Sequence, residues 1–425
     1  MYTGTELRSL VQQDKVHRRI YTDKNIFELE MQKIFGRLWV FVGHESQVPE
    51  KHDYITTNIG HQPVILARAA DNNVRIFFNR CSHRGVKLCT NKKGSSRSFV
   101  CPYHGWAFKN DGKLLGTPYR EGFDDKFFDI EDLDLKSPAQ VDSYRGFIFA
   151  SLSSKIQPLH DYLGGIKSSI DDLCDRAPDG EISATAGCNR YIIRSNWKQQ
   201  IDNAVDLYHA PFAHASTLDK DGRQFSRHGG GPSFYKPGTK QFIDFDPMGV
   251  WGFENGHGFQ GAVPQVDRPT GGAFNELYEA LEARHGQERA DQILAYDRFN
   301  SVIYPNLTFQ AFGQHIRVII PISVERTEIR IYPVLLKGAP ERWNREAVRS
   351  VASTHSPASM IQTDDVAVFE RAQLGLKAES VNWVHFARHM GAEEPDARGG
   401  HRGPGSSEFV LRRQYNEVWL KNMCE

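Results

Sequence analysis

Two short segments, each holding one cysteine and one histidine, constrain this chain of 425 residues more than any other feature. The first pair is Cys81 and His83, and the second is Cys101 and His104, with residues 84–100 between them. A structural zinc finger usually pairs cysteine with cysteine and histidine with histidine, whereas the two ligand types alternate here. A [2Fe–2S] centre with two cysteines on one iron and two histidines on the other needs loops of this alternating kind. The spacing therefore predicts such a centre, with a zinc ribbon or four core residues at chance spacing as the alternative.

The segments around these pairs are rich in short runs of β-forming residues separated by turn formers. Asn110, Asp111 and Gly112 give a hairpin signal, and similar turn residues separate the other runs. The runs lie at 38–42, 63–67, 74–78, 99–101, 107–108 and 146–150. This pattern predicts a small all-β module over residues 38–155.

The rest of the chain has a mixed pattern. A first helix is expected from about Asp23, a plausible N-cap, to Gly36. Helical periodicity recurs near 158–173, 196–218, 272–299 and 357–375, with strand-like runs at 318–322 and 327–332 and an amphipathic tail at 409–423. Glycine-rich loops are expected at 229–232 and 256–272, and a surface loop at 391–407. This is the α+β arrangement, an antiparallel sheet with helices packed on it.

These patterns divide the chain into three segments. Residues 1–37 form an N-terminal helix that is expected to belong to the same domain as residues 156–425, and residues 38–155 form the β module.

A second group of metal-binding residues lies within 202–214, a stretch with helical periodicity. Asp206 and His209 are three apart and would share one helix face. His214 is five residues beyond His209, but Pro211 should kink the helix and bring it back. An iron site with open positions also needs a carboxylate. Periodicity alone leaves two candidates for it, in the Asp364-Asp365 pair of the 357–375 segment.

Each of these residues also has a simpler interpretation. A lone helical histidine is often a capped or solvated residue rather than a ligand. Two adjacent aspartates would ordinarily be a helix N-terminal charge pair that the helix dipole favours. The site is indicated by the residues jointly, with the cysteine and histidine pairs upstream.

Together the two groups resemble the large (α) subunit of Rieske non-heme iron ring-hydroxylating oxygenases. The pattern C-x-H-x17-C-x2-H, with Arg84-Gly85 and Gly105-Trp106 as flanks, is followed by D-x2-H-x4-H and a later acidic helix. Respiratory Rieske proteins carry an extra cysteine in each loop, where this chain has other residues. The resemblance covers nearly the whole chain and implies an all-β Rieske module plus a helix-grip, START-like catalytic domain.

The resemblance also implies the ligands of both centres. In this family the ligand aspartate is followed five residues later by an acidic residue, which selects Asp365, with Glu370, over Asp364. The cluster ligands would be Cys81, His83, Cys101 and His104, and the Fe(II) ligands His209, His214 and Asp365.

A third implication is a bridge between the centres. The carboxylate matching Asp206 joins a cluster histidine of one subunit to an iron-ligating histidine of its neighbour, and Tyr103 beside His104 would sit in the same bridge. Asp202, one turn earlier, falls where related chains often have asparagine.

The implied reaction uses O₂ and electrons from NAD(P)H. The electrons arrive through a reductase, with or without a ferredoxin, enter the [2Fe–2S] cluster and reach the mononuclear Fe(II). The product would be a cis-dihydrodiol or a phenol. Transfer between subunits implies a ring of three α chains, commonly joined by a small β subunit as α3β3, with α3 as the alternative.

The substrate pocket is expected to be apolar and aromatic. Its walls would come from Leu207, His257 in the loop 256–258, the strand around 303–312 and Phe369. His257 could instead shape its own loop. Chain length, motif flanks and the run at 362–365 look most like the branch acting on aromatic carboxylates such as salicylate, anthranilate or benzoate.

Other functions remain open. Polycyclic or substituted arenes are the main rival substrates. A Rieske O- or N-demethylase or amine monooxygenase would keep the oxygenase chemistry. A plain Rieske electron carrier would need the cluster but not the residues after it.

Composition excludes several other classes. Fifty-two Lys+Arg balance 52 Asp+Glu, so no nucleic-acid partner is expected. No window approaches the roughly 18 apolar residues of a membrane span. Neither a signal peptide nor a disulfide framework is apparent, since the six cysteines are few and scattered. These features predict a cytoplasmic protein.

Overall fold

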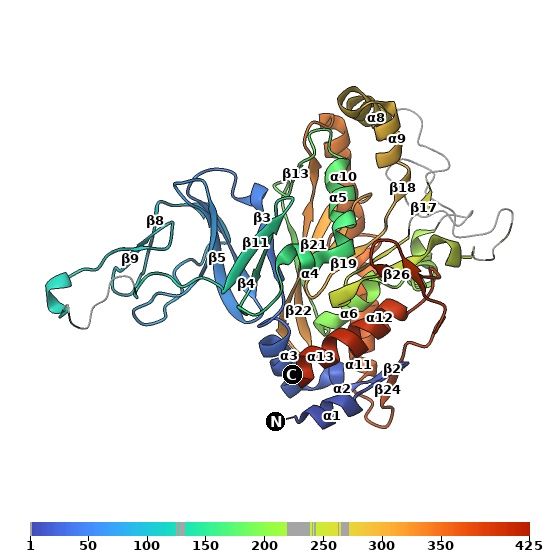
Figure 1. The fold of residues 1–425 in the computed structure, drawn as a ribbon, viewed down its shortest axis with the longest axis horizontal. Coiled ribbons are helices and arrows are strands. Elements are labelled where there is room, and N and C mark those ends of the chain that lie inside the picture. The colour runs from blue at the N-terminus through green and yellow to red at the C-terminus, as the bar shows by residue number, and fades with distance from the viewer. Residues whose placement is uncertain are drawn as a thin grey trace. The chain divides into compact units, whose positions relative to one another are not determined.

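The computed structural model describes residues 2–124, 126, 132–218, 239, 241, 244–261, 263–264 and 272–425. The glycine-rich loop expected at 229–232 lies outside these residues, as does most of 262–271. The chain forms two compact units, one of residues Met31–Leu159 and one of Met1–Glu30 with His160–Glu425 (Figure 1). In the described part of the chain, no helix has the length and apolar character needed to span a membrane.

The boundary between the units differs from the expected one at residues 31–37. These residues go with the β unit. A Cβ at Gly60 would lie only 3.0 Å from the Cβ of Phe35. Met31 and Phe35 thus lie against the turn at Gly60, which is part of the β unit.

The β unit contains three small antiparallel sheets. Their strand orders are β6-β5-β4-β7, β11-β12-β3 and β10-β9-β8. The strands are β3 (Val40–His44), β4 (Asp53–Ile59), β5 (Gln62–Arg68), β6 (Val74–Phe78), β7 (Lys93–Ser95), β8 (Ser98–Val100), β9 (Ala107–Lys109), β10 (Leu114–Gly116), β11 (Gln140–Tyr144) and β12 (Phe147–Ser151). Cys81 and Cys101 belong to a buried cluster that includes Ile65, Phe77 and Phe108. The expected β module is therefore present, and both cysteines lie in its core.

A nine-stranded antiparallel sheet dominates the second unit, in the order β14-β22-β21-β20-β19-β16-β15-β26-β25. Its strands are β14 (Asn189–Ile193), β15 (Val250–Gly252), β16 (Gly258–Gln260), β19 (Ser301–Ile303), β20 (Leu307–Gln310), β21 (His315–Ser323), β22 (Arg326–Pro333), β25 (Glu394–Asp396) and β26 (Gly400–Gly403). The two strands expected at 318–322 and 327–332 are confirmed as the long β21–β22 hairpin. Short strands elsewhere are β13 (Ile182–Ser183), β17 (Val263–Pro264), β18 (Tyr296–Asp297) and β23 (Leu335–Leu336).

The prediction of a surface loop at 391–407 is wrong, because β25 and β26 lie there and add two strands to the edge of the sheet. Gly400 allows this, since a Cβ there would lie 2.5 Å from the carbonyl oxygen of Gly252. The glycines that suggested a loop are instead needed for close approach of two backbones.

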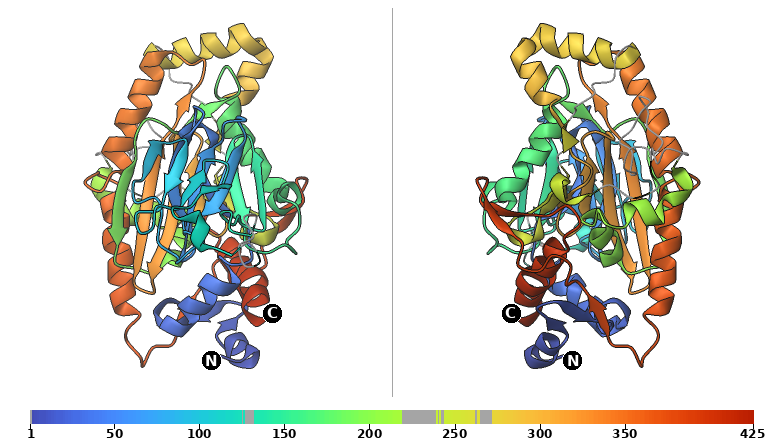
Figure 2. Two further views of the ribbon diagram at one scale, coloured as in Figure 1. Left: turned by 90° about the vertical axis from the view of Figure 1, so that its left-hand side faces the viewer. Right: turned by 90° about the vertical axis from the view of Figure 1, so that its right-hand side faces the viewer.

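Helices α6, α10 and α11 pack on this sheet, and Figure 2 shows the long α10 and α11, in orange, along one side of it. The helices are α4 (Leu159–Leu163), α5 (Lys167–Asp175), α6 (Trp197–Ala204), α7 (Ala210–Ala213), α8 (Gly272–His285), α9 (Gln287–Ile293), α10 (Glu341–His355), α11 (Gln362–Gly375), α12 (Phe409–Arg413) and α13 (Leu420–Cys424). Helix α10 was not expected, because its buried stripe of Trp343, Ala347, Val351 and Thr354 holds only three apolar residues in 15.

The N-terminal segment holds α1 (Gly4–Ser9), α2 (Arg19–Thr22) and α3 (Lys24–Lys33), with β1 (Val11–Gln12) and β2 (Lys15–His17) pairing with β24 (Trp383–His385). The predicted N-cap is confirmed, since Asp23 accepts hydrogen bonds from the backbone of Asn25 and Ile26. Single 3₁₀ turns lie at Glu45–Gln47, Arg120–Gly122, Gly164–Ile166, Ala215–Thr217, Asp246–Met248 and Glu254–Gly256, and a π-helical turn at Gln414–Trp419.

A buried carboxylate fixes the start of α6, the helix that leads to the second metal site. Glu30 of α3 accepts hydrogen bonds from Lys198 Nζ at 2.7 and 2.8 Å. It also accepts them from the indole nitrogens of Trp197 at 2.9 Å and Trp419 at 2.8 Å. All four hydrogen bonds to the Glu30 carboxylate lie inside the core. Both of its oxygens therefore have partners, and the buried charge of Lys198 is paired.

Candidate metal centres

The two loops that carry the cysteine and histidine pairs have the same backbone turn. The amide of Gly85 donates to the carbonyl of Cys81 at 3.0 Å, and the amide of Gly105 donates to Cys101 at 3.0 Å. Both glycines have positive φ, +76° and +71°. This conformation is rare for other residues. The flanking glycines of the sequence motif are therefore required by the turn itself.

The four side chains fit a two-iron cluster. Cys81 and Cys101 are buried, and burial together with the neighbouring thiol raises the pKa of Cys81. The rings of His83 and His104 are 4.7 Å apart and only partly buried. Two thiols inside and two imidazoles toward the surface match a [2Fe–2S] cluster with one thiolate-held and one imidazole-held iron.

Aromatic rings support the two imidazoles. Trp106 stacks on His83 with ring centroids 4.6 Å apart, and Tyr103 packs on His104 at 3.8 Å. Tyr103 itself is 58% exposed. It is therefore accessible from outside the β unit.

The second site brings three predicted residues together. Ligand atoms of His209, His214 and Asp365 all lie within 4.8 Å of one another. The Nε2 atoms of His209 and His214 are 3.8 and 3.4 Å from Asp365 Oδ1. Two imidazoles and one carboxylate converging on one point fit the facial triad that binds Fe(II) and leaves positions open.

The backbone reaches this geometry differently from the prediction. The prediction of one continuous helix kinked at Pro211 is wrong, because α6 ends at Ala204 and a separate helix, α7, begins at Ala210. Pro211 lies in the first turn of α7, where proline needs no hydrogen-bond donor. His209 and His214 flank this one-turn helix, which is how residues five apart face the same point.

Helix α11 brings the carboxylate, and the structure distinguishes its two aspartates. Asp365 lies between the two Nε2 atoms, whereas Asp364 Oδ2 lies 3.5 Å from Nδ1 of His214. Asp206 Oδ2 has the matching position 3.6 Å from Nδ1 of His209. Each histidine thus has a second carboxylate near Nδ1, its outer nitrogen, while Nε2, its inner nitrogen, faces Asp365. Such a second carboxylate orients metal-binding imidazoles. Glu370 lies elsewhere, where it accepts the backbone N–H of Arg194.

The two imidazoles have different electrostatic surroundings. Burial lowers the pKa of His209, but the carboxylates of Asp206 and Asp365 outweigh it, so the pKa is raised. At His214 burial prevails, and the pKa is lowered.

Asn203 is a site residue that sequence reasoning missed. Its side-chain nitrogen lies 3.0 Å from His209 Nε2 and donates to Asp365 Oδ1 at 3.2 Å. Its position one turn after Gln199 on α6 was visible in the sequence, but an asparagine in a helix gives no metal-site signal.

The expected pocket residues have separate places. Leu207 is buried in a small cluster with Phe245, and Phe369 is buried one turn after Asp365 on α11. His257 does not fit a pocket wall, because its ring contacts the Tyr162 carbonyl at 3.1 Å and accepts the Tyr304 amide at 3.1 Å. Both nitrogens are used to hold the 256–258 loop.

Asp202 lies in the core rather than in the metal site. Its carboxylate accepts hydrogen bonds from the hydroxyls of Tyr21 at 2.7 Å and Tyr415 at 3.0 Å. Burial raises the pKa of Asp202 to about 7, against the opposing effects of both tyrosines and Lys198. Below that pH the native protein holds a proton here.

Replacing Asp202 with asparagine should alter how stability depends on pH. Between about pH 4 and 7 the native state keeps a proton that the unfolded state has lost, so wild-type stability falls as pH rises through this window. The variant lacks this slope. The difference in melting temperature, variant minus wild type, should therefore be a few degrees larger at pH 8 than at pH 5. Thermal unfolding at both pH values tests this, with Asp161→Asn, an exposed carboxylate, as the control. Equal slopes for Asp202→Asn and wild type would contradict it.

Comparison with known proteins places these sites in a family. Residues 161–405 match the ring hydroxylating alpha subunit (catalytic domain), and residues 38–138 match the Rieske [2Fe-2S] domain. The α subunit of toluate 1,2-dioxygenase from Pseudomonas putida is 34% identical, over 100% of this chain and 96% of that protein. The large subunit of 2-halobenzoate 1,2-dioxygenase from Burkholderia cepacia is 34% identical, over 88% and 80%.

Comparison with solved structures supports the same family. Naphthalene 1,2-dioxygenase bound to phenanthrene superposes with a TM-score of 0.85 at 25% identity, covering 100% of this chain and 96% of that one. A quaternary ammonium Rieske monooxygenase shares the fold, with a TM-score of 0.68 at 19% identity over 96% and 95%. The chain thus belongs to the ring-hydroxylating dioxygenase α subunits, terminal oxygenases that combine a Rieske [2Fe–2S] cluster with a mononuclear non-heme iron and work with a ferredoxin and a reductase.

Proposed function

We propose that this chain oxidises an aromatic carboxylate, adding both atoms of O₂ as a cis-dihydrodiol or one atom as a phenol. The observation that carries this proposal is the convergence of His209, His214 and Asp365 on one point. The toluate and 2-halobenzoate enzymes, at 34% identity, support a carboxylate. An anthranilate 1,2-dioxygenase large subunit at 28% identity adds to that support.

In this proposal the iron is held by those three residues and the cluster by Cys81, His83, Cys101 and His104. Fe(II) with open positions supplies the O₂ chemistry when bound. The chain's own residues hold the imidazoles: Asp206 and Asp364 lie against the outer nitrogens, and Asn203 lies beside the inner one of His209. Residues 38–155 would carry the cluster, and residues 156–425 with the N-terminal segment the iron.

Asp206 and Tyr103 are proposed to link the cluster of one subunit to the iron of the next. Both are accessible on their own units, since Tyr103 is 58% exposed and the Asp206 side chain 28% exposed. Such a link between subunits requires a ring, so we propose an α3 assembly. We also propose that a small β subunit joins it as α3β3 and that the enzyme is located in the cytoplasm. Mass measurement of the purified complex distinguishes α3β3 from α3.

Other functions are less well supported. A plain electron carrier is wrong, because residues 161–405 match the catalytic domain of the family. A polycyclic arene is the second candidate, favoured by naphthalene 1,2-dioxygenase from Pseudomonas putida at 31% identity over 85% of this chain and 80% of that protein. Demethylation or amine oxidation has support from the fold alone.

Product analysis under ¹⁸O₂ tests the proposal. The reconstituted enzyme, with reductase and ferredoxin, is given toluates, halobenzoates, anthranilate and salicylate in one set and naphthalene and biphenyl in another. We expect labelled products from the carboxylates, with two labelled oxygens for dihydroxylation and one for hydroxylation. Labelled products from the arenes alone would replace the carboxylate with the polycyclic substrate.

A further inference from the structure

A buried polar cluster lies on the sheet face that carries α6, α10 and α11. Side chains two apart on a strand share a face, so His315 and Arg317 of β21 point the same way. Arg317 pairs with Thr308 of β20 in register, and these directly opposed residues also share that face. His315 and Thr308 are fully buried, and Arg317 is only 3% exposed. Three polar side chains are thus gathered inside the catalytic unit.

Helix α11 connects this cluster to the metal site. Arg317 Nη2 donates to the side-chain oxygen of Gln362 at 3.1 Å. Asp365 follows Gln362 by three residues, so both lie on one side of α11, about 4.5 Å apart along the helix axis. The last residue of α10, His355, places its ring 4.2 Å from that of His315. The cluster therefore borders the iron-ligand group through the first turn of α11.

The guanidinium of Arg317 has no counter-charge of its own. Among the described residues, no carboxylate oxygen lies within 4.0 Å of it, and its Nε has no hydrogen-bond partner. Burial lowers the pKa of Arg317, against the smaller opposing effects of Tyr191 and of Asp365, the carboxylate that the metal would use. Burial lowers the pKa of His315 and of His355 well below the usual range, so both imidazoles are neutral. Arginine stays charged in proteins, so one buried cation remains unneutralised.

The surrounding groups are also short of partners, and they can all donate. The Thr308 hydroxyl, the Tyr191 hydroxyl and the side-chain nitrogen of Gln362 are buried without a hydrogen-bond partner in the described chain. Tyr191 of β14 shares the face with Arg317 through the aligned pairs on β22. Burying so many unpaired donors around a cation is costly. An anion with several acceptor lone pairs would satisfy them together.

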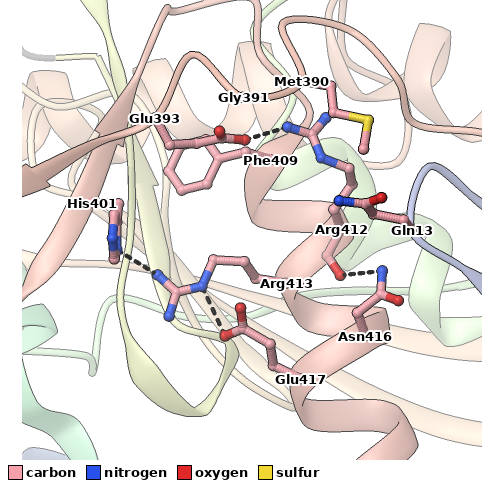
Figure 3. A pocket seen from close by; sticks show the side chains of 10 residues that line it. All are labelled: Gln13, Met390, Gly391, Glu393, His401, Phe409, Arg412, Arg413, Asn416 and Glu417. Atoms are coloured by element: carbon pink, nitrogen blue, oxygen red, sulfur yellow. Dashed lines mark hydrogen bonds and ion pairs between the residues drawn. The ribbon is translucent and has the colours of Figure 1, made fainter.

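Two arginines elsewhere in the catalytic unit differ from Arg317 in having carboxylate partners. The groove in Figure 3, with a volume of about 710 Å³, lies between the C-terminal segment and residues 390–401. There Arg412 pairs with Glu393, and Arg413 pairs with Glu417 at 2.8 Å. Each of those cations is neutralised by a carboxylate of the chain, whereas Arg317 has only a neutral amide.

We propose that Arg317 binds the carboxylate of the substrate, with Thr308, Tyr191, His315 and Gln362 as further hydrogen-bond donors around it. The ring of the substrate then extends from this cluster toward His209, His214 and Asp365. This proposal rests on the proposed oxidation of aromatic carboxylates and identifies the residue that selects them. Arg317 is in this sense a specificity residue rather than a general structural one.

Ligand binding to the intact enzyme without turnover provides the test. Anaerobic calorimetry on the holoenzyme would compare benzoate with benzamide, which has nearly the same shape and no charge. We expect Arg317→Met to weaken benzoate binding by about 10- to 100-fold, the loss typical of hydrogen bonds to a charged group. Benzamide binding should change little. Arg413→Met, which removes a paired arginine, should affect neither ligand.

Two further variants keep the proposal open to refutation if Arg317→Met does not fold. Arg317→Lys keeps the charge but loses the planar fork, and should weaken benzoate binding less than methionine does. Thr308→Val removes one unpartnered hydroxyl; a merely structural cluster predicts unchanged binding, whereas we expect weaker benzoate binding alone. Iron content and the visible spectrum of the cluster confirm that each variant is intact.

The outcomes separate this proposal from the function it rests on. If the wild-type enzyme oxidises benzoates and the Arg317 variants bind benzoate as tightly as wild type, the carboxylate site lies elsewhere while the function stands. An equal loss of benzoate and benzamide by an intact variant assigns Arg317 to structure and overturns the proposal. If wild type neither binds nor oxidises any carboxylate but oxidises naphthalene, both proposals fail.

Discussion

Replacing Asp365 with alanine will reduce the iron content from three atoms per chain to two and stop product formation. Asp365 Oδ1 faces both inner imidazole nitrogens, at 3.8 and 3.4 Å, so its loss leaves only two ligands for the mononuclear iron. The proposed cluster ligands lie in the other compact unit and should be unaffected. Metal analysis, the visible spectrum of the cluster and product formation measure the three expectations.

Asp364→Ala is the matched control. This neighbour carries the same charge on the same first turn of α11, but it faces the outer nitrogen of His214 at 3.5 Å and accepts the Ser216 hydroxyl at 3.2 Å. Removing it should weaken iron binding or activity by about 10-fold, at the lower end for residues that orient a metal-bound imidazole. A chain that loses its third iron through Asp364→Ala and keeps it through Asp365→Ala would reverse the assignment.

The cluster loops were predictable because their information is local. Cys81 with His83 and Cys101 with His104 sit in turns closed by hydrogen bonds a few residues apart, and each turn needs its own glycine. The strands beside them follow from β-forming runs and turn residues. Sequence spacing therefore specifies both the four candidate side chains and the backbone that presents them.

The convergence of His209, His214 and Asp365 was predictable from the sequence, but the backbone that produces it was not. The sequence around Pro211 indicated a kinked helix, whereas the structure ends α6 at Ala204 and starts α7 at Ala210. Proline is compatible with both arrangements, since it is tolerated at a kink and favoured in a first turn. Likewise, periodicity could not choose between Asp364 and Asp365, which differ only in the direction that α11 faces when packed.

Features that depend on distant partners were missed. Arg317 stands among apolar residues in a strand, and nothing in the sequence shows that its register partners are buried. The 391–407 segment looked like a loop because its glycines permit a turn as readily as a close strand pairing with Gly252. For His257 the sequence allowed either a pocket wall or a residue that shapes its own loop, and the contacts of both ring nitrogens with Tyr162 and Tyr304 favour the loop. In each case, tertiary contacts decide among conformations that the local sequence allows.

Replacing Asp206 with asparagine should leave all three irons bound and still reduce turnover by about 100-fold or more, the upper end for losing a carboxylate that holds a metal-bound imidazole. The Asp206 carboxylate accepts the amides of Tyr208 at 2.8 Å and His209 at 3.3 Å, and its second oxygen faces His209 Nδ1 at 3.6 Å. A carboxylate there favours a proton on Nδ1 and leaves Nε2 free for the metal.

An asparagine can keep the backbone contacts but places an N–H group toward Nδ1, which removes both the charge and the acceptor. The proposed bridge between the cluster and a neighbouring iron would then lose its central link, while the three iron ligands remain. Rapid mixing of the reduced enzyme with substrate and O₂ should show the cluster of Asp206→Asn oxidising far more slowly than that of wild type. Asp364→Asn makes the same chemical change beside His214, which has no place in the bridge, so its cluster should oxidise no more than about 10-fold more slowly than that of wild type. Equal slowing in both variants would mean that these aspartates only orient imidazoles, and an unchanged rate in Asp206→Asn with full iron would remove Asp206 from the electron path.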